Sequence, residues 1–249
     1  MYQNLTALKK FTGPVSWFIK RHTCRPPVGR VTWGDLEQIE PISKSWGFDR
    51  GVPIDRYYME RFLSKYSRDV RGRVLEIGDN EYTRRYGGKR VAKSDILHVV
   101  EGNPKATLTA NLASAPQLPS ETFDCIICTQ TLQLIYDVPA AVATLYRLLS
   151  PGGVLLATVP GISRIVHGDG VLGDYWRFTL ASATRLFEAC HGAEVQVQAR
   201  GNVLSAVAFL HGLATEDVRV DDLEADDPDY QVLITVRVTK AARIDHVRT

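Results

Sequence analysis

Apolar runs that alternate with helix-like stretches constrain the fold of this 249-residue chain more than any other feature. The segments VLEIG (74–78), FDCIICTQ (123–130) and VLLATV (154–159) are largely apolar throughout, as expected of strands that are buried on both faces. Between the last two lies a stretch of helical periodicity that Asp137 is placed to cap, and Thr179 precedes another. Such alternation indicates a parallel sheet covered by helices on both faces.

The end of the chain has a different pattern. EVQVQAR (194–200) alternates between polar and apolar residues as a strand does, and YQVLITVRV (230–238) is a closing strand. The stretch between them lacks the long helical crossover that two parallel strands require, so one late strand is expected to be antiparallel. The predicted fold class is α/β: a doubly wound, mostly parallel sheet with a late antiparallel strand and an N-terminal helical cap.

Composition shifts divide the chain into four parts. Residues 1–30 end in a proline-rich connector and are predicted to be a tail, and residues 31–72 are predicted to be a cap or lid segment. The helix of that segment begins near Pro53, with Asp55 as its expected cap. Residues 73–240 are predicted to form the main domain, and residues 241–249 a C-terminal tail.

The bulk properties exclude several classes of protein. A formal net charge of +2 creates no field that would favour nucleic acid or an anionic membrane surface. No apolar run approaches the roughly 18 residues that a membrane-spanning helix needs. The expected location is the cytoplasm, and the composition leaves the oligomeric state open.

The cysteines do not predict a metal site. Cys125 and Cys128 have zinc-like spacing, but they belong to a predicted strand, where residues three apart point to opposite faces. No second cysteine pair completes a site, since the others are the isolated Cys24 and Cys190. We therefore expect small core residues in a reduced protein.

The turn after the first predicted strand discriminates between cofactors. A dinucleotide requires G-x-G-x-x-G for close approach of the pyrophosphate, but after Gly78 this turn has Asp79, Asn80 and Glu81. No P-loop motif occurs either. Asp95 follows Gly78 by seventeen residues, a spacing that suits a carboxylate bound to a ribose diol. S-adenosylmethionine has the ribose but no phosphate, and its sulfonium tolerates nearby carboxylates.

The succession VLEIGD, AKSDIL, LTANLASAPQLPSETFDCIICTQTLQLIYD and LYRLLSPGGVLLATVPG resembles class I S-adenosylmethionine-dependent methyltransferases, which have a Rossmann-like fold. The similarity covers residues 73–160, and GVPIDRYYMERFL and GDYWRFT resemble a bacterial branch associated with glycosyltransferases and sugar O-methylation. The resemblance implies that S-adenosylmethionine is the cofactor and S-adenosylhomocysteine the product. The cofactor-binding residues it implies are Glu76, Gly78 and Asp79 at the methionine tail, Asp95 at the ribose, Asn111 and Leu112 at the adenine, and Thr129 and Gln130 near the methyl group.

The loop GISRIVHGDGVLGDYWRFT (161–179) has the composition of an acceptor site. Carboxylates and arginines hydrogen-bond sugar hydroxyls, and aromatic faces stack on sugar rings. A hydroxyl acceptor also needs a base, for which His167 and Asp174 are the candidates. Tyr175, Trp176 and Arg177 are the predicted substrate-binding residues, with ordinary packing and an Arg177–Asp174 ion pair as the alternative. No metal-ligating residues are predicted, although some sugar methyltransferases use a divalent cation.

The preferred hypothesis is an O-methyltransferase that acts on a hydroxyl of a saccharide or a glycosylated small molecule. One alternative is a methyltransferase for a non-sugar small molecule. A second is a non-catalytic methyltransferase-like binding protein, which the missing glycines would permit. An NAD-dependent oxidoreductase is disfavoured by the same missing glycines.

Overall fold

The computed structural model describes residues 25–167 and 173–243, and the chain divides into two units, residues 1–39 and 40–249. In the first unit the described residues are almost all exposed and contain one 3-10 turn, Gly34–Glu37. Cys24 and most of the two predicted tails lie outside the described residues. The division at residues 30/31, 72/73 and 240/241 stays a prediction.

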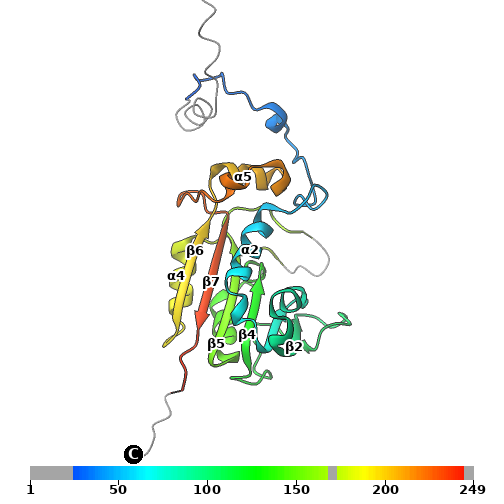
Figure 1. The fold of residues 1–249 in the computed structure, drawn as a ribbon, viewed down its shortest axis with the longest axis vertical. Coiled ribbons are helices and arrows are strands. Elements are labelled where there is room, and N and C mark those ends of the chain that lie inside the picture. The colour runs from blue at the N-terminus through cyan, green and yellow to red at the C-terminus, as the bar shows by residue number, and fades with distance from the viewer. Residues whose placement is uncertain (1–24, 168–172, 244–249) are drawn as a thin grey trace, which may run out of the picture. The chain divides into compact units, whose positions relative to one another are not determined.

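The second unit is built on a seven-stranded sheet with the strand order β3-β2-β1-β4-β5-β7-β6 (Figure 1). Strands β1 to β5 pair in parallel, whereas β7 is antiparallel to both β5 and β6. The predicted mostly parallel sheet with a late antiparallel strand is therefore confirmed. The strands are β1 Gly72–Ile77, β2 Val91–His98, β3 Leu108–Thr109, β4 Phe123–Thr129, β5 Leu149–Pro160, β6 Glu194–Arg200 and β7 Leu233–Thr239.

Polar caps set the beginning of most helices. Asp137 Oδ1 accepts a hydrogen bond from the Ala140 amide at 3.0 Å, and Thr179 caps the next helix through the Ser182 amide. Both predicted caps are thus confirmed. The expected cap Asp55 is wrong, because the N-cap position belongs to Pro53. The helices are α2 Ile54–Lys65, α3 Val138–Leu148, α4 Leu180–Glu188, α5 Val203–Leu210 and the short α6 Val220–Leu223.

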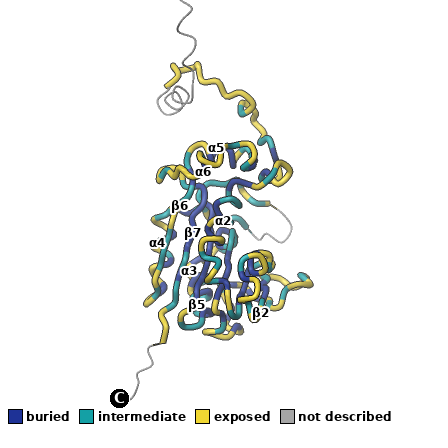
Figure 2. Tube along the Cα trace, viewed as in Figure 1, coloured by how far each residue is buried: buried dark blue, intermediate teal, exposed yellow. Residues whose placement is uncertain are grey.

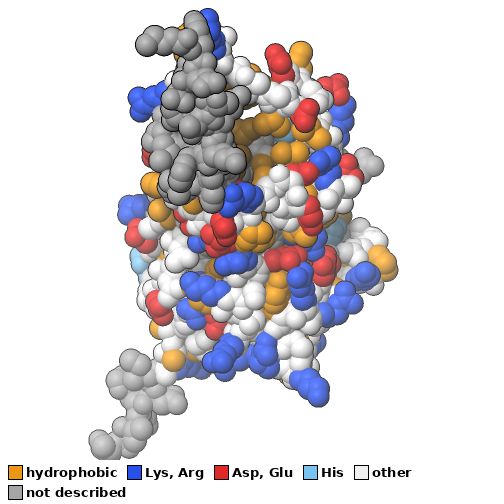
Figure 3. All heavy atoms as spheres, turned by 45° about the horizontal axis from the view of Figure 1, so that its top comes forward, with side chains coloured by type: hydrophobic (Ala, Val, Ile, Leu, Met, Phe, Trp, Pro, Cys, Tyr) orange, Lys and Arg blue, Asp and Glu red, His pale blue; other side chains and the backbone are white. Residues whose placement is uncertain are grey.

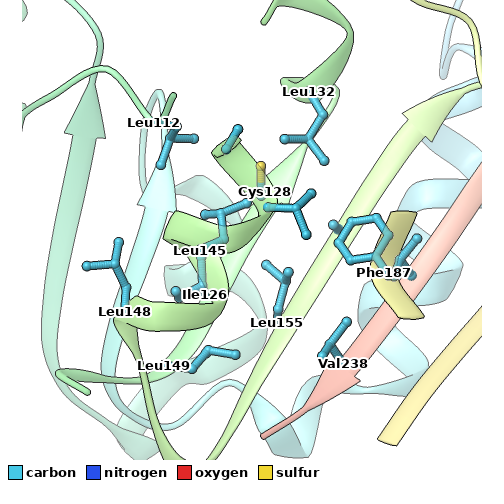
Figure 4. Close-up of a cluster of buried hydrophobic side chains, with 14 of the residues drawn as sticks. Leu112, Ile126, Cys128, Leu132, Leu145, Leu148, Leu149, Leu155, Phe187 and Val238 are labelled. Carbon is cyan, nitrogen blue, oxygen red and sulfur yellow. The ribbon is translucent and has the colours of Figure 1, made fainter. Parts of the chain in front are cut away.

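Helices cover the sheet on both faces, and each face has its own apolar cluster. On one face α3 and α4 pack against the sheet through side chains such as Leu145 and Phe187 (Figure 4). On the other face α2 and α5 supply Tyr58 and Phe209 among others. Because successive strand residues alternate between faces, a central parallel strand must be apolar throughout. The continuous apolar pattern that predicted β4 and β5 has this origin.

The two cysteines of β4 show the alternation directly. Cys125 belongs to the cluster beneath α2 and α5, and Cys128 to the cluster beneath α3 and α4. Their thiols therefore lie on opposite faces of the sheet, as the three-residue spacing predicted. Both thiols are fully buried, and burial raises the pKa of Cys128 to about 12.

The surface carries charges of both signs (Figure 3). Buried residues concentrate in the central strands and exposed residues in the outer turns (Figure 2). Acidic and basic side chains are interspersed over the face drawn in Figure 3, consistent with the small net charge. Across the described ranges, no helix is both long enough and apolar enough to cross a bilayer.

Candidate active site

A concave site lies where the parallel strands end, at the edge of the sheet where doubly wound folds bind ligands. This first cavity has a volume of about 470 Å³. Its walls are mainly apolar, with a few polar groups, as is typical of small-molecule sites. The lining residues are Ile77, Gly78, Leu97, His98, Val99, Ala110, Asn111, Leu112, Ala113, Thr131, Leu134, Ile135, Tyr136, Asp137 and Tyr175.

The turn after β1 opens directly onto the first cavity. Gly78 has φ +94°, a backbone conformation that L side chains rarely adopt, and it is exposed on the cavity side. A Cβ atom added at Gly78 would meet no protein atom within 4 Å. The backbone at Gly78 is therefore open to the first cavity, and its predicted cofactor role stays a prediction.

Glu76 supports this turn from beneath. Its buried carboxylate accepts hydrogen bonds from the Tyr82 amide at 3.1 Å, and from both the amide and the hydroxyl of Thr83 at 2.7 Å. Burial raises the pKa of Glu76 to about 7, and the hydrogen bonds from Thr83 and Tyr82 oppose that shift. Glu76 does not line the first cavity in the described structure; it bonds the backbone of Tyr82 and Thr83, which follow the turn.

Asp79 is an exposed residue of the same turn. Its Oδ1 accepts a hydrogen bond from the Glu81 amide at 2.9 Å, which shapes the turn. Among the described residues it is not part of the first cavity's lining. The cofactor role predicted for Asp79 stays a prediction.

Asn111 and Leu112 both line the first cavity, at the positions where the resemblance expects adenine contacts. Leu112 is buried and belongs to the main apolar cluster. Asn111 Oδ1 accepts a hydrogen bond from the Ala113 amide at 2.9 Å, which fixes the orientation of its side chain. These two residues therefore line the same cavity as Gly78, and their predicted adenine contacts stay a prediction.

Asp95, the residue predicted at the ribose, does not line the first cavity in the described structure, and its ribose role stays a prediction. Strand β2 continues to His98, so Asp95 lies inside the strand and pairs in register with Leu75. Its carboxylate is 2 % exposed, accepts a hydrogen bond from Arg73 Nε at 2.7 Å, and also contacts Thr107 Oγ1 at 3.2 Å. Spacing alone cannot distinguish a strand interior from its end. The lining of the first cavity at the end of β2 comes from His98 and Val99 instead.

The segment after β4 separates two cavities. Gln130 has φ +46°, in the left-handed region that is strained for a residue with a side chain. Its side chain lies against a second cavity, whereas Thr131, one residue later, lines the first. Thr129 is the last residue of β4 and lines neither cavity in the described structure. The predicted methyl-side role of Thr129 stays a prediction.

The second cavity lies beyond the ends of β4 and β5 and beneath the beginning of α2. It has a volume of about 300 Å³ and shares Leu134 with the first cavity, so the two are direct neighbours. Gln133 Oε1 and Arg164 Nε are buried at this cavity and have no hydrogen-bond partner in the described structure. The lining residues are Trp46, Phe48, Asp55, Arg56, Met59, Gln130, Gln133, Leu134, Pro160, Ser163, Arg164, Val166, Asp174, Phe209 and Val232.

Asp55 is a residue whose position the sequence interpretation missed. It lines the second cavity from the first turn of α2, and burial raises its pKa to about 6. In the sequence, Asp55 is a carboxylate next to an aromatic-rich segment, and a helix-capping role accounts for such a residue equally well. Only the packing of α2 against the strand ends brings Asp55 to a cavity.

The predicted base Asp174 is held in an ion pair. Both guanidinium amines of Arg177 bond its carboxylate, at 2.5 and 2.8 Å, and the Val166 amide adds a third bond at 2.8 Å. The hydrogen bond from Arg177 holds the pKa of Asp174 below its usual range. Arg177 also donates to the carbonyls of Ser163 and Arg164. The pair therefore fastens the two ends of the loop together.

The other predicted residues of the loop 161–179 do not share the surroundings of Asp174. His167 is exposed and does not line either cavity in the described structure. Tyr175 lines the first cavity and packs edge-on against Tyr136, with ring centroids 5.4 Å apart. Trp176 donates its indole N–H to the carbonyls of Ile135 and Tyr136. Tyr175 thus borders the first cavity, whereas Trp176 lines neither cavity in the described structure; the predicted substrate contacts of both stay a prediction.

The comparisons with known proteins agree with this arrangement. Residues 63–157 match a family described as a methyltransferase domain. A probable S-adenosylmethionine-dependent methyltransferase of Mycolicibacterium smegmatis is 28% identical over 236 residues, which cover 85% of this chain and 91% of that protein. A malonyl-[acyl-carrier protein] O-methyltransferase of Serratia marcescens is 29% identical over 140 residues, 52% of this chain and 53% of the relative.

Solved structures show the fold. The crystal structure of the [4+2]-cyclase SpnF superposes with a TM-score of 0.51 at 15% identity, over 75% of this chain and 81% of that chain. Fold likeness of this kind does not carry a reaction with it. The methyltransferase-domain match over residues 63–157, the similarity to the Mycolicibacterium relative and the seven-stranded sheet together support an S-adenosylmethionine-dependent methyltransferase with a Rossmann-like α/β fold.

Proposed function

We propose that this enzyme methylates a hydroxyl of a saccharide or a glycosylated small molecule that binds in the second cavity. The observation that carries the proposal is the shared wall at Leu134, because methyl donor and acceptor must occupy adjoining sites. Gln130 and Pro160, at the ends of β4 and β5, line the second cavity on the side of the sheet.

The cofactor fits the first cavity. Its apolar walls at Val99, Leu112 and Ile135 suit an adenine ring, and the exposed turn at Gly78 suits the amino-acid tail. When bound, S-adenosylmethionine supplies a methyl group activated by a sulfonium. The protein's task is to hold the acceptor oxygen in line with that group and to exclude water.

The size of the second cavity favours a single ring. About 300 Å³ lies at the lower end of small-molecule sites. Trp46 and Phe48 supply aromatic surface, although the Arg164 guanidinium already lies over the Trp46 ring at 3.5 Å from its centroid. The space suits one sugar unit, with the rest of a glycosylated molecule outside it.

The polar groups of the second cavity favour a hydroxylated acceptor. Gln133 Oε1 is an acceptor and Arg164 Nε a donor, and neither has a partner in the described structure. A buried group left unpaired costs about 1–3 kcal/mol. A hydroxyl both donates and accepts, so an acceptor with hydroxyls near these two atoms would satisfy both.

The test is a mass measurement with candidate acceptors. The full chain is incubated with deuterated-methyl S-adenosylmethionine and a panel of monosaccharide glycosides, phenols and carboxylic acids. We expect a mass gain of one labelled methyl on a glycoside. Transfer confined to phenols or acids would overturn the saccharide assignment while leaving methyl transfer intact.

A pair of variants tests whether Gln133 contacts the acceptor. Gln133→Met removes the unpaired acceptor together with the Nε2 hydrogen bonds to Gln130, and Gln117→Met changes an exposed glutamine outside both cavities. We expect Gln133→Met to raise KM for the glycoside about tenfold, the cost of one lost hydrogen bond. Affinity for S-adenosylhomocysteine should stay within about twofold in both variants. An unchanged KM in Gln133→Met would remove Gln133 from the acceptor site.

A further inference from the structure

Asp55 lies at the second cavity, on the opposite side from the strand ends. It is the second residue of α2 and shares the cavity lining with Gln130 and Gln133, which follow β4. One of its carboxylate oxygens accepts a hydrogen bond from the Arg56 amide at 2.8 Å. That bond fixes the carboxylate at the beginning of the helix.

The guanidinium of Arg56 is directed elsewhere. It bonds Glu60 at 2.9 Å and Glu81 at 2.7 Å. Among the described residues, no basic side chain forms a salt bridge with Asp55 within 4.0 Å. Asp55 is therefore a partly buried carboxylate that faces a cavity without an ion-pair partner in the described structure, in contrast to Asp174.

Other charged residues line the second cavity together with Asp55. Arg56 comes from its own helix, Arg164 from the segment after β5, and Asp174 from the loop that ends at α4. Asp174 is neutralised by Arg177, and the nearby Arg56 lowers the pKa of Asp55 without cancelling the effect of burial, so the value remains about 6. A base of this strength is charged at neutral pH and still able to take a proton.

We infer that Asp55 is the general base that removes the proton from the acceptor hydroxyl. In this step the O–H bond breaks and its proton passes to a carboxylate oxygen of Asp55. The acceptor oxygen forms a bond to the methyl carbon, and the electron pair of the methyl–sulfur bond remains on sulfur. Asp55 then releases the proton to solvent. The inference rests on the proposed function, because only a hydroxyl acceptor needs such a base.

The test compares Asp55→Asn with the full-length wild type and with Asp229→Asn, a change at an exposed loop residue outside both cavities. With the glycoside acceptor, Asp55→Asn should lower kcat about 100-fold or more, and Asp55→Glu should recover part of that loss. The wild-type kcat should rise with pH through about 6, and this dependence should disappear in Asp55→Asn.

A thiol analogue of the acceptor separates proton removal from packing. Near pH 9 a thiol is largely ionised and needs no base, so Asp55→Asn should methylate it at close to the wild-type rate. Equal losses with hydroxyl and thiol acceptors would mean that Asp55 only positions the acceptor. An unchanged kcat with the hydroxyl would overturn the inference alone. A wild type that methylates no hydroxyl would overturn the proposed function together with it.

Discussion

The carboxylate of Glu76 accepts hydrogen bonds from both the amide and the hydroxyl of Thr83, each at 2.7 Å. This contact ties the end of β1 to the beginning of the helical turn Thr83–Gly87. The intervening turn carries Gly78 and forms part of the first cavity. A buried carboxylate therefore joins the two sides of a turn that has Gly78 but not the later glycines of the dinucleotide motif.

Glu76 should make the stability of the protein depend on pH. Its pKa is about 7 in the folded protein against 4.5 when exposed, so folding favours the protonated form. The stabilisation is complete below pH 4.5 and is lost as pH rises through 7, by up to about 3 kcal/mol. Denaturant titrations across this window should show a shallower decline in Glu76→Gln. An equal slope in both proteins would contradict the assignment.

Gly78→Ala should weaken cofactor binding specifically. The positive φ costs alanine about 1–2 kcal/mol, and the added methyl would project toward the first cavity. Gly102→Ala is the matched control, because Gly102 has φ +108°, no atom within 4 Å of an added Cβ, and no part in the first cavity's described lining. Calorimetry with S-adenosylhomocysteine should show at least a tenfold loss for Gly78→Ala and less than about twofold for Gly102→Ala. Equal losses would mean that backbone strain alone is responsible.

Asp95→Asn should affect stability rather than cofactor binding. The change removes the charge that pairs with Arg73 and leaves the site otherwise filled. We expect the free energy of unfolding to fall by about 1–3 kcal/mol, since Arg73 is partly exposed and can be hydrated. Affinity for S-adenosylhomocysteine should remain within about twofold. A tenfold loss of affinity without a loss of stability would restore the ribose role to Asp95.

The Asp174–Arg177 pair should behave as a structural clamp. A double-mutant cycle with Asp174→Asn and Arg177→Gln measures the coupling directly through unfolding free energies. The Asp174 side chain is inaccessible to solvent, so a coupling of about 1–3 kcal/mol is expected. The rise of kcat through about pH 6 should persist in Asp174→Asn, because the pKa of Asp174 lies lower. Additive effects, or loss of that rise, would contradict the clamp.

Some of the candidate site residues line the first cavity and others do not, and the difference depends on which sequence pattern suggested them. Asn111 and Leu112 follow the short strand β3 after Ala110 and reached the first cavity. Asp95 did not, because a carboxylate within a strand and one at its end have nearly the same local sequence. The deciding contact, with Arg73, comes from the neighbouring strand β1. Pairing across strands is not visible in a local pattern.

The sequence by itself determined the layered architecture. Strands buried on both faces must be continuously apolar, and helices on a sheet must be amphipathic, so both leave periodic traces along the chain. Cys125 and Cys128 lie on opposite faces because side chains alternate along a strand. The caps at Asp137 and Thr179 likewise follow from residue type and position next to a helix.

Only the tertiary structure decided which polar side chains meet. Asp55 and Gln133 are far apart in the chain and share a cavity because α2 packs over the ends of β4 and β5. Asp174, a candidate base by composition, is instead bound by Arg177. Whether a carboxylate is paired or left facing a cavity depends on three-dimensional distance and burial, and neither quantity is encoded in the local spacing of residues.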